Sequence, residues 1–379
     1  MRFLLVAAFA AAGASAWAGE DVRTVEPAAN AVVRQMNDFQ REYFATPRVQ
    51  REVNFTNKVF RHKMAAAKSA PLPVRFSWTG GEPPFAVRVC EGDRVFVETN
   101  LAERAVDLYN FNIATTYRWT VTSAGKTAES TFRTEDRAPR LIRVPGLHSV
   151  RDLGGRRGLD GRRIRQGLVY RSCGLNANAK IVYSDKERKV IDKDKSTVGK
   201  SFLSESARAY VVDVLGIRTE IDLRSPVRET LHMTGSPLGE KVKWLNYSSS
   251  AYGAVVRKGG GAAAFAKVFA VFLDEANYPI DFHCIAGRDR TGTVAFLLLA
   301  LLGVDEDELA ADWEALGFQF STTALTHART YNGLPRSLLN NKELAGTTLC
   351  EKTESFVKSL GFTDEQIAKF RSIMLEPKE

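Results

Sequence analysis

The 379-residue sequence predicts a multidomain protein with an N-terminal all-β sandwich and a C-terminal α/β domain built on a central, mostly parallel sheet. Three observations lead to this prediction. Residues 73–133 form short runs of alternating polar and apolar residues with turn residues between them. Residues 135–140 form a charged linker that contains proline. Beyond the linker, apolar strands alternate with helical segments. A hydrophobic content of 44% is enough for two cores.

We expect residues 19–137 to form the sandwich. Its strand runs are short and are separated by Gly-rich or acidic turns, which is typical of antiparallel sandwiches. With Trp78 on an early strand and Tyr117 and Trp119 on a late one, the segment resembles a fibronectin type III or similar immunoglobulin-like module. Residues 25–33 would supply the first strand and residues 35–68, rich in helix formers, a helical insertion. Such a module is a candidate binding site for an envelope or protein partner.

Residues 1–18 have the composition of a secretory signal peptide. Arg2 is followed by the apolar residues 3–12, and small residues then provide a cleavage site at 14–16 or 16–18. The alternative is a buried N-terminal helix. The apolar run is too short to span a bilayer, and no later run reaches about 20 residues. We therefore expect a periplasmic or secreted protein without a transmembrane segment.

Charge and cysteine content exclude several other classes. The net charge of +9 favours anionic partners in general, but basic residues are not interleaved with aromatic ones as nucleic-acid binding requires. We expect no nucleic-acid partner. The cysteines are few and widely spaced, without a CxxC pair or a histidine cluster, so neither a disulfide framework nor a zinc site is indicated. These cysteines are Cys90, Cys173, Cys284 and Cys350. We expect no metal and no organic cofactor.

The segment 283–292, HCIAGRDRTG, carries the candidate chemistry. It lies between a predicted strand at 278–283 and a predicted helix at 291–302. The backbone N–H groups of a tight loop that opens a helix bind anions. Arg290 can bind two phosphoryl oxygens with its planar guanidinium, and the same positive field favours the thiolate of Cys284 as a nucleophile.

The other loop residues have supporting roles in this interpretation. Gly287 permits the turn of the backbone. The Thr291 hydroxyl can donate a hydrogen bond to the sulfur, and His283 braces the loop through hydrogen bonds. The phosphate-binding set is Ile285, Ala286, Gly287, Arg288, Asp289 and Arg290. The alternative is an inert buried cysteine before a core helix, with the arginine on the surface by chance.

The segment matches the CX5R loop of the protein-tyrosine phosphatase superfamily. With RDLGG at 151–155 and DLR at 222–224, the chain resembles bacterial tyrosine/dual-specificity phosphatases whose loop reads HCxAGKDRTG. The resemblance extends over about residues 138–376 and implies a phosphatase domain at 138–379. Arg288 replaces the loop lysine of that family.

Two further departures from the family pattern concern the sequence before the loop. Cys173 occupies a position that is usually small or polar. The Lys-rich stretch 180–200 is a predicted insertion, and we expect it to form a hairpin.

The resemblance implies hydrolysis in two steps. The Cys284 thiolate attacks phosphorus to form a thiophosphate intermediate, which water then hydrolyses. A general acid protonates the leaving oxygen. The resemblance suggests Asp289, with Asp222 as the competing candidate. The other interpretation of Asp222 is a strand-end residue paired with Arg224 or another arginine.

Other functions remain open at this stage. Similar loops also serve phosphatases of inositol phosphates or phosphoinositides, and the extra charge of Arg288 is compatible with such substrates. A rhodanese-like sulfurtransferase also uses a loop cysteine, and a non-catalytic envelope protein would only bind phosphate. The substrate expected here is a phosphotyrosine-containing protein or another phosphomonoester. A reversible Cys173–Cys284 disulfide is a further hypothesis, because an exported thiolate is exposed to oxidation.

Overall fold

The computed structural model describes residues 20–176, 180–183, 190–194, 202–257, 261–318 and 329–378. The expected signal peptide at 1–18 lies outside these residues. The chain divides into two units, which we describe separately: Met1–Asn37 with Pro71–Ala138, and Asp38–Ala70 with Pro139–Glu379. Among the described residues, no helix is long and apolar enough to cross a membrane.

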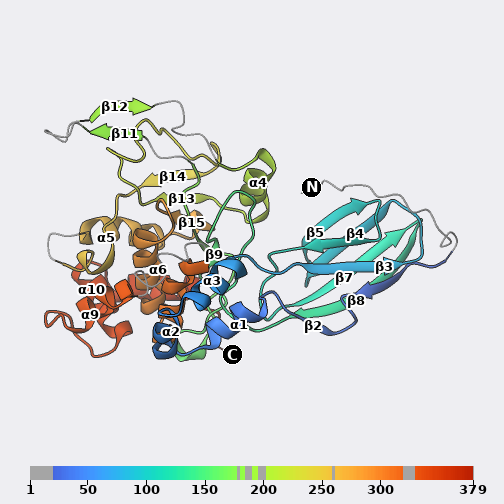
Figure 1. Cartoon of the computed structure of the whole chain (residues 1–379), viewed down its shortest axis with the longest axis horizontal. Helices are drawn as coiled ribbons and strands as arrows, with labels where there is room; N and C mark the ends of the chain where they lie inside the picture. Colours follow the sequence, from blue (N-terminus) through green and yellow to red (C-terminus); the bar gives the residue numbers. More distant parts are fainter. Residues whose placement is uncertain are drawn as a thin grey trace. The chain divides into compact units, whose positions relative to one another are not determined.

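The first unit contains two β-sheets (Figure 1). The smaller sheet has the order β1-β3-β6, with both pairings antiparallel. The larger sheet has the order β2-β8-β7-β4-β5, in which β2 runs parallel to β8 and the other neighbours are antiparallel. The bounds are β1 (Arg23–Glu26), β2 (Ala31–Val33), β3 (Val74–Thr79), β4 (Phe85–Glu91), β5 (Arg94–Leu101), β6 (Ala105–Leu108), β7 (Thr116–Ser123) and β8 (Lys126–Thr134).

The two sheets share one core and therefore form a β-sandwich. The ring of Phe76 on β3 contacts the rings of Trp119 on β7 and Phe132 on β8, with centroids 5.1 and 5.5 Å apart. Buried and more exposed residues alternate along β3 and β7, as the period-two pattern predicted. The single strand expected at 25–33 is two strands, β1 and β2, one in each sheet. The fibronectin type III likeness stays a prediction.

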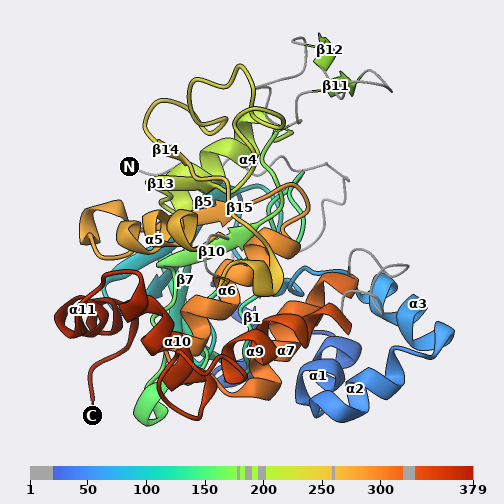
Figure 2. The ribbon, with the colours of Figure 1, turned by 90° about the vertical axis from the view of Figure 1, so that its left-hand side faces the viewer.

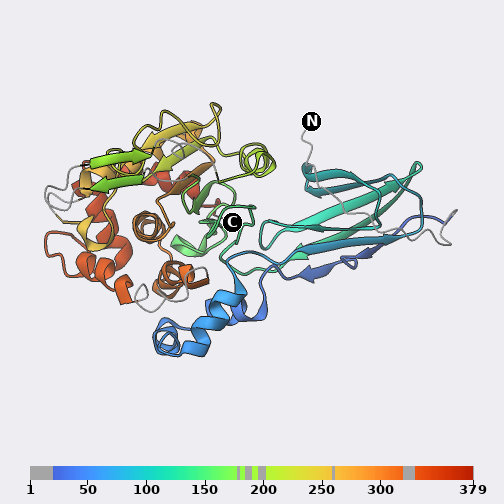
Figure 3. The same ribbon diagram turned by 45° about the horizontal axis from the view of Figure 1, so that its top comes forward.

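The helical segment expected at 35–68 is present, but it belongs to the second unit. Its helices are α1 (Asp38–Ala45), α2 (Arg48–Asn54) and α3 (Lys58–Ala67). Tyr43, Phe55 and Met64 pack in one apolar cluster with Ala315 and Phe318, which follow α7 (Glu306–Glu314). Figure 2 shows α1–α3 beside α7, and in Figure 3 the blue helices again lie against the orange ones. The sequence analysis placed this segment inside the sandwich domain; its apolar side chains instead complete the core of the other unit.

The second unit is built on a five-stranded sheet of order β14-β13-β15-β10-β9. The first four strands pair in parallel and β9 is antiparallel to β10, so the sheet is mostly parallel, as predicted. Every residue of β10, β13 and β15 is buried, as expected for strands covered on both faces. The bounds are β9 (Arg151–Asp152), β10 (Val169–Ser172), β13 (Thr219–Asp222), β14 (Lys243–Asn246) and β15 (Ile280–His283).

Helices cover both faces of this sheet (Figure 2). Neighbouring residues of β10 point to different cores: Val169 packs in the cluster of α5, α6, α10 and α11, and Tyr170 in the cluster that includes Ala207 of α4. The helix α6 follows the central strand β15, and all residues from Thr291 to its end are buried. The bounds are α4 (Glu205–Ala209), α5 (Ala262–Val271), α6 (Asp289–Leu301), α9 (Gly333–Leu339), α10 (Leu349–Ser359) and α11 (Asp364–Met374).

One sequence-based expectation in this unit is confirmed at the level of the backbone. The strands β11 (Lys180–Tyr183) and β12 (Val190–Asp194) pair antiparallel, so the predicted hairpin is present. The helix α11 begins after Thr363, whose side chain accepts a hydrogen bond from the amide of Gln366 in a capping box.

Candidate active site

The predicted loop lies between the carboxyl end of β15 and the first turn of α6. This edge of a parallel sheet is where open α/β folds bind anionic ligands. The loop requires glycine at position 287, because the backbone φ is +65° and an added Cβ would lie 2.4 Å from the carbonyl oxygen of Ser172. The backbone of the loop therefore packs directly against the end of β10.

Cys284 opens the loop, and its side chain is buried. Burial by itself raises the pKa of the thiol. Nevertheless the pKa is lowered, because the hydroxyl and amide of Thr291, the charge of Arg290 and the amide of Arg288 all favour the thiolate. Of the predicted loop residues, Arg288, Arg290 and Thr291 thus act on the sulfur.

The hydroxyl of Thr291 is the strongest of these influences that favour the thiolate. Its oxygen is buried and makes no hydrogen bond of standard geometry within the described residues. We therefore attribute its effect to its position beside the Cys284 sulfur and not to an established hydrogen bond. A thiolate in place of the thiol would be a stronger acceptor for this hydroxyl.

Arg290 is held by a carboxylate that the sequence analysis did not identify. Its Nη1 and Nη2 donate to Glu229 Oε2 and Oε1 at 2.6 and 3.0 Å, and Nη1 also lies 3.2 Å from the carbonyl oxygen of Leu223. The amide of Ser225 donates to Glu229 Oε2 at 2.6 Å, which fixes the carboxylate in turn. The signal in the sequence was weak: Glu229 is the one acidic residue between Asp222 and Glu240.

Asp289, the preferred general acid, is partly exposed at the first turn of α6, with 28% of its side chain accessible. Its Oδ1 accepts hydrogen bonds from Arg288 Nε, at 2.9 Å, and from the hydroxyl of Tyr252. Burial and the nearby carboxylate raise the pKa of Tyr252 well above its usual value, so that hydroxyl stays a donor. The sequence analysis did not identify Tyr252.

Asp222, the competing candidate, lies at the end of β13 and is 0% exposed. Its two oxygens accept from the amide, Nε and Nη2 of Arg224 at 2.6–3.1 Å. Burial raises the pKa of Asp222, but the charges of His283 and Arg224 hold it below its usual value. The structure therefore contains the Asp222–Arg224 pair that was the alternative interpretation of this residue.

His283 lies behind the loop and is fully buried. Its Nδ1 is 3.0 Å from the carbonyl oxygen of Cys284, and its Nε2 is 2.9 Å from Glu220 Oε1. Both partners are acceptors, so both nitrogens donate and the ring carries a positive charge. Burial opposes that charge, but Asp222 and Glu220 outweigh it and raise the pKa of His283 to about 9.

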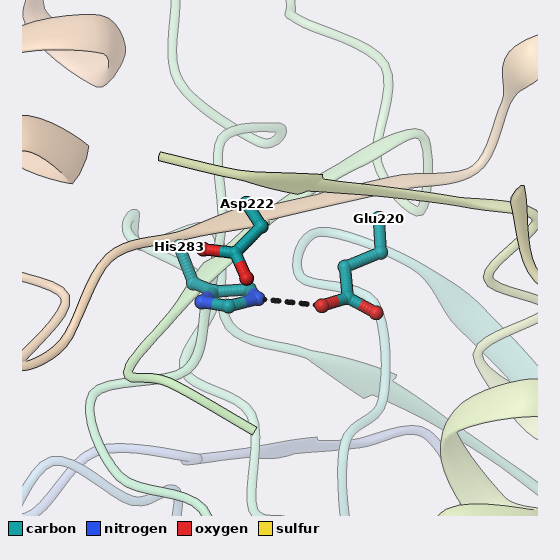
Figure 4. A group of neighbouring side chains, drawn as sticks. All are labelled: Glu220, Asp222 and His283. Atoms are coloured by element: carbon teal, nitrogen blue, oxygen red, sulfur yellow. Dashed lines mark hydrogen bonds and ion pairs between the residues drawn. The ribbon is translucent and has the colours of Figure 1, made fainter. Parts of the chain in front are cut away.

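Glu220, Asp222 and His283 gather closely enough to form a possible metal-ligand set (Figure 4). Each of them already has a protein partner. His283 donates to Glu220 Oε1, the hydroxyl of Ser236 donates to Glu220 Oε2, and Arg224 binds both oxygens of Asp222. We interpret the group as a buried hydrogen-bond network that supports the loop from behind.

Comparison with known proteins agrees with this geometry. Residues 199–376, which include the loop, Asp222 and Glu229, match the model of the tyrosine phosphatase family. This part of the second unit is thus similar to the tyrosine phosphatase family. A putative tyrosine-protein phosphatase of Cupriavidus necator, H16_A0669, is 28% identical over 222 residues, which cover 50% of this chain and 71% of that protein. The chain is thus a phosphatase, as the loop sequence led us to expect.

Part of this chain is also similar to solved structures. The core catalytic domain of the PP-IP phosphatase SIW14 from S. cerevisiae, in complex with citrate, has 14% sequence identity and a TM-score of 0.26. The match covers 44% of this chain and 84% of that one.

A cavity of about 410 Å³ adjoins the phosphatase loop. Ile285 and Ala286 of the loop form one side, and Ile285 is 43% exposed. The remaining lining residues are Gly146, His148, Cys173, Gly174 and Phe202. Burial raises the pKa of the Cys173 thiol, although the amide of His148 donates to its sulfur at 3.3 Å. Cys173 is therefore a poorer nucleophile than Cys284, and both are free thiols. The disulfide between them stays a hypothesis.

Proposed function

We propose that this phosphatase hydrolyses phosphotyrosine-type monoesters through a cysteinyl-phosphate intermediate on Cys284. The observation that carries the proposal is the lowered pKa of this buried thiol, which follows β15 in the loop before α6, together with an arginine aligned by Glu229. A buried cysteine without such surroundings would have a raised pKa, as Cys173 does.

In the first step, the Cys284 sulfur attacks phosphorus and the ester P–O bond breaks. The loop amides and Arg290 stabilise the charge on the three phosphoryl oxygens that do not react. The ion pair with Glu229 supports this role. Glu229 binds Nη1 and Nη2 of Arg290 and so fixes the plane of the guanidinium, but it does not occupy the Nε–H, which can donate to a phosphoryl oxygen.

The leaving oxygen needs a proton, and we propose that Asp289 supplies it. Asp289 is partly exposed on the turn that follows the loop, where a bound ester would project. Asp222 is less suited, because it is fully buried and its oxygens are engaged by Arg224. A general acid must reach the leaving oxygen directly or through one water.

In the second step, water attacks phosphorus, the S–P bond breaks, and the Cys284 thiolate is restored. Asp289, now ionised, accepts the proton of that water. Inorganic phosphate leaves the loop, and no redox change occurs in either step.

A substrate panel tests the proposal. The purified mature protein, kept reduced, is assayed on phosphotyrosine and phosphoserine peptides and on soluble inositol phosphates. We expect turnover of the phosphotyrosine peptide, unchanged by a chelator. The Cys284→Ser protein should lose turnover but still bind the peptide, whereas Cys350→Ser, altered on α10, should keep full activity. Turnover by the Cys284→Ser protein would exclude Cys284 as the nucleophile.

Inositol phosphates or phosphoinositides form the second candidate substrate class. The observation that favours them is Arg288, a partly exposed cation on the loop, with 31% of its side chain accessible. A second phosphate on the substrate could pair with such a charge. Higher kcat/KM for inositol phosphates than for the peptide, lost in Arg288→Met, would assign this class instead.

We also propose that the protein is exported, on the evidence of residues 1–18 alone. Cell fractionation, with the N-terminus of the purified protein read by mass spectrometry, tests this. A mature N-terminus at residue 17 or 19 in the periplasm or medium is expected. Recovery of the uncleaved chain in the cytoplasm would overturn it.

A further inference from the structure

A fully buried arginine outside the predicted site contacts the phosphate loop. Arg171, on β10, is 1% exposed, and its Nη2 donates to the carbonyl oxygen of Gly287 at 2.8 Å. The two residues are 116 positions apart in the sequence. Burying a guanidinium is costly unless charges and hydrogen bonds compensate for it, so its position at the loop requires an explanation.

Asp312 on α7 compensates for the charge of Arg171. Its Oδ2 accepts from Arg171 Nη1, while its Oδ1 accepts from Arg151 Nε at 3.0 Å and from Arg156 Nη2 at 2.8 Å. Burial raises the pKa of Asp312, but the three arginines hold it far below its usual value. A permanently ionised carboxylate thus fixes one edge of the Arg171 guanidinium, and the other edge faces the loop.

The carbonyl that Arg171 binds belongs to the peptide unit that also contains the N–H of Arg288. A trans peptide is planar, and its C=O and N–H point in opposite directions. The Arg288 amide is one of the groups that favour the thiolate of Cys284 and so lower its pKa. The carbonyl oxygen that Arg171 binds and the Arg288 N–H, which favours the thiolate, therefore lie at opposite edges of one peptide unit.

This plane needs an external constraint. Gly287 has a φ of +65°, and glycine has more backbone freedom than any other residue. Without a partner for its carbonyl oxygen, the plane could rotate and turn the Arg288 N–H away from the sulfur. A hydrogen bond from a charged donor opposes that rotation more strongly than one from water or a neutral group.

We propose that Arg171, oriented by Asp312, is a positioning residue that holds the Gly287–Arg288 peptide plane so that its N–H points at the nucleophile. The proposal rests on the proposed function in that Cys284 is taken as the nucleophile. Arg171 touches neither substrate nor sulfur and acts through the loop backbone alone.

Arg156 provides a matched control. It is also buried, at 2% exposure, and binds the same carboxylate, but its other contacts are the carbonyl oxygens of Asp152 and Leu153 and not the loop. Arg171→Met and Arg156→Met therefore remove the same charge from Asp312. Only the first also removes a hydrogen bond to Gly287.

The experiment measures the rate of Cys284 alkylation by iodoacetamide against pH, followed by mass spectrometry of the peptide that contains Cys284. It needs no substrate. We expect Arg171→Met to be alkylated about tenfold more slowly than wild type near pH 6, which corresponds to a pKa rise of about one unit. Arg156→Met should stay within about twofold of wild type. With substrate, kcat should fall more than KM rises in Arg171→Met.

Equal shifts in the two variants, or no shift in Arg171→Met, would overturn the proposal. If circular dichroism shows that Arg171→Met is unfolded, Arg171→Lys replaces it. A lysine keeps the charge but cannot bind Asp312 and Gly287 with one planar group, so a smaller shift in the same direction is expected. If Arg171→Lys then showed the same pH dependence of Cys284 alkylation as wild type, the proposal would be overturned. Turnover by Cys284→Ser would instead contradict the proposed function and leave the alkylation result valid.

Discussion

Arg290 and Glu229 form a two-pronged ion pair, with Nη1–Oε2 and Nη2–Oε1 distances of 2.6 and 3.0 Å. The two residues lie 61 positions apart, and each has about a fifth of its side chain exposed. The pair places the guanidinium beside the sulfur of Cys284, which the charge of Arg290 helps to ionise. We therefore expect catalysis by this loop to depend on a carboxylate outside the CX5R segment.

The first prediction concerns that carboxylate. Glu229→Gln keeps the size of the side chain but removes the charge that orients Arg290. We expect kcat/KM to fall by about 10- to 100-fold and inhibition by vanadate to weaken in parallel, because the phosphoryl oxygens lose an aligned donor. Steady-state kinetics measure both. Glu240→Gln, at an exposed position, is the control and should leave kcat/KM and the inhibition constant of vanadate unchanged. Inhibition of Glu229→Gln by vanadate as strong as that of wild type would contradict the role of Glu229 in orienting Arg290.

The second prediction separates the two candidate acids. Asp289→Asn should lower kcat by about 100-fold or more for phenyl phosphate, whose leaving group needs a proton, and by much less for an activated aryl phosphate. Asp222→Asn should instead destabilise the protein by about 3–5 kcal/mol, because it leaves Arg224 buried without its counter-charge. Leaving-group dependence of kcat and urea unfolding measure the two effects. The reverse pattern would make Asp222 the acid.

The third prediction concerns Tyr252, whose hydroxyl donates to Asp289. Tyr252→Phe keeps the ring, which packs on Trp313 at a centroid distance of 5.8 Å, and removes only the donor. We expect kcat to fall by about 3- to 10-fold for poor leaving groups and to be unchanged for activated ones, because a less well oriented acid matters only when protonation limits the rate. An equal loss for both substrate types would indicate a role in binding.

The fourth prediction is a pH dependence of stability. The folded-state pKa of His283 is about 9, above the usual value of 6.5, so the folded protein binds this proton more tightly than the unfolded chain. The stabilisation is therefore fully present below pH 6.5 and is lost as the pH rises through 9. The shift corresponds to roughly 3–4 kcal/mol.

Urea unfolding at pH 6, 7.5 and 9.5 tests this, with His283→Gln for comparison. We expect the difference in unfolding free energy between wild type and variant to shrink at the highest pH. A difference that is constant over this range would mean that His283 is neutral in the folded state.

The fifth prediction concerns the helices α1–α3. Arg51 on α2 donates to Glu314 at the end of α7, with an Nε–Oε2 distance of 2.7 Å and almost complete burial of both side chains. Arg51→Met should lower the free energy of unfolding by about 3–5 kcal/mol, because it leaves the Glu314 carboxylate unpaired. Lys358→Met, at a more exposed ion pair, should cost less than about 1 kcal/mol.

This effect should also depend on pH. Burial raises the pKa of Glu314 to about 7 even though Arg51 lowers it, and without Arg51 the pKa would be higher still. A raised carboxyl pKa means that stability is lost as the pH rises through that value. The cost of Arg51→Met should therefore be larger at pH 8 than at pH 5, as measured by urea unfolding. An equal cost at both pH values would contradict the burial of an ionised Glu314.

Local sequence was sufficient for the parts of the site that lie in one segment. The strand before Cys284, the loop and the helix from Asp289 are continuous in the chain, and residue types within the loop report its backbone geometry. The sandwich strands were likewise recognisable, because a period of two is a property of neighbouring residues. The helices at 35–68 were recognised as helices for the same reason.

Glu229, Tyr252 and Arg171 were missed because each reaches the loop from another element. A carboxylate, a phenol and a guanidinium are common surface groups, and nothing next to them in the sequence distinguishes a loop contact from a solvated side chain. The assignment of α1–α3 to the wrong unit has the same origin. Tyr43, Phe55 and Met64 predict an amphipathic segment but not the apolar surface that it covers.

The amino-acid sequence alone determined which sulfur and which arginine belong to one anion-binding loop, because five consecutive residues between them set the geometry of a single turn. Only the tertiary structure decided what holds that turn in place: Glu229 on the arginine, His283 and Glu220 behind the cysteine, and Arg171 on the glycine carbonyl. The physical reason is that hydrogen bonds and ion pairs act over about 3 Å in space, whatever the separation of their partners along the chain.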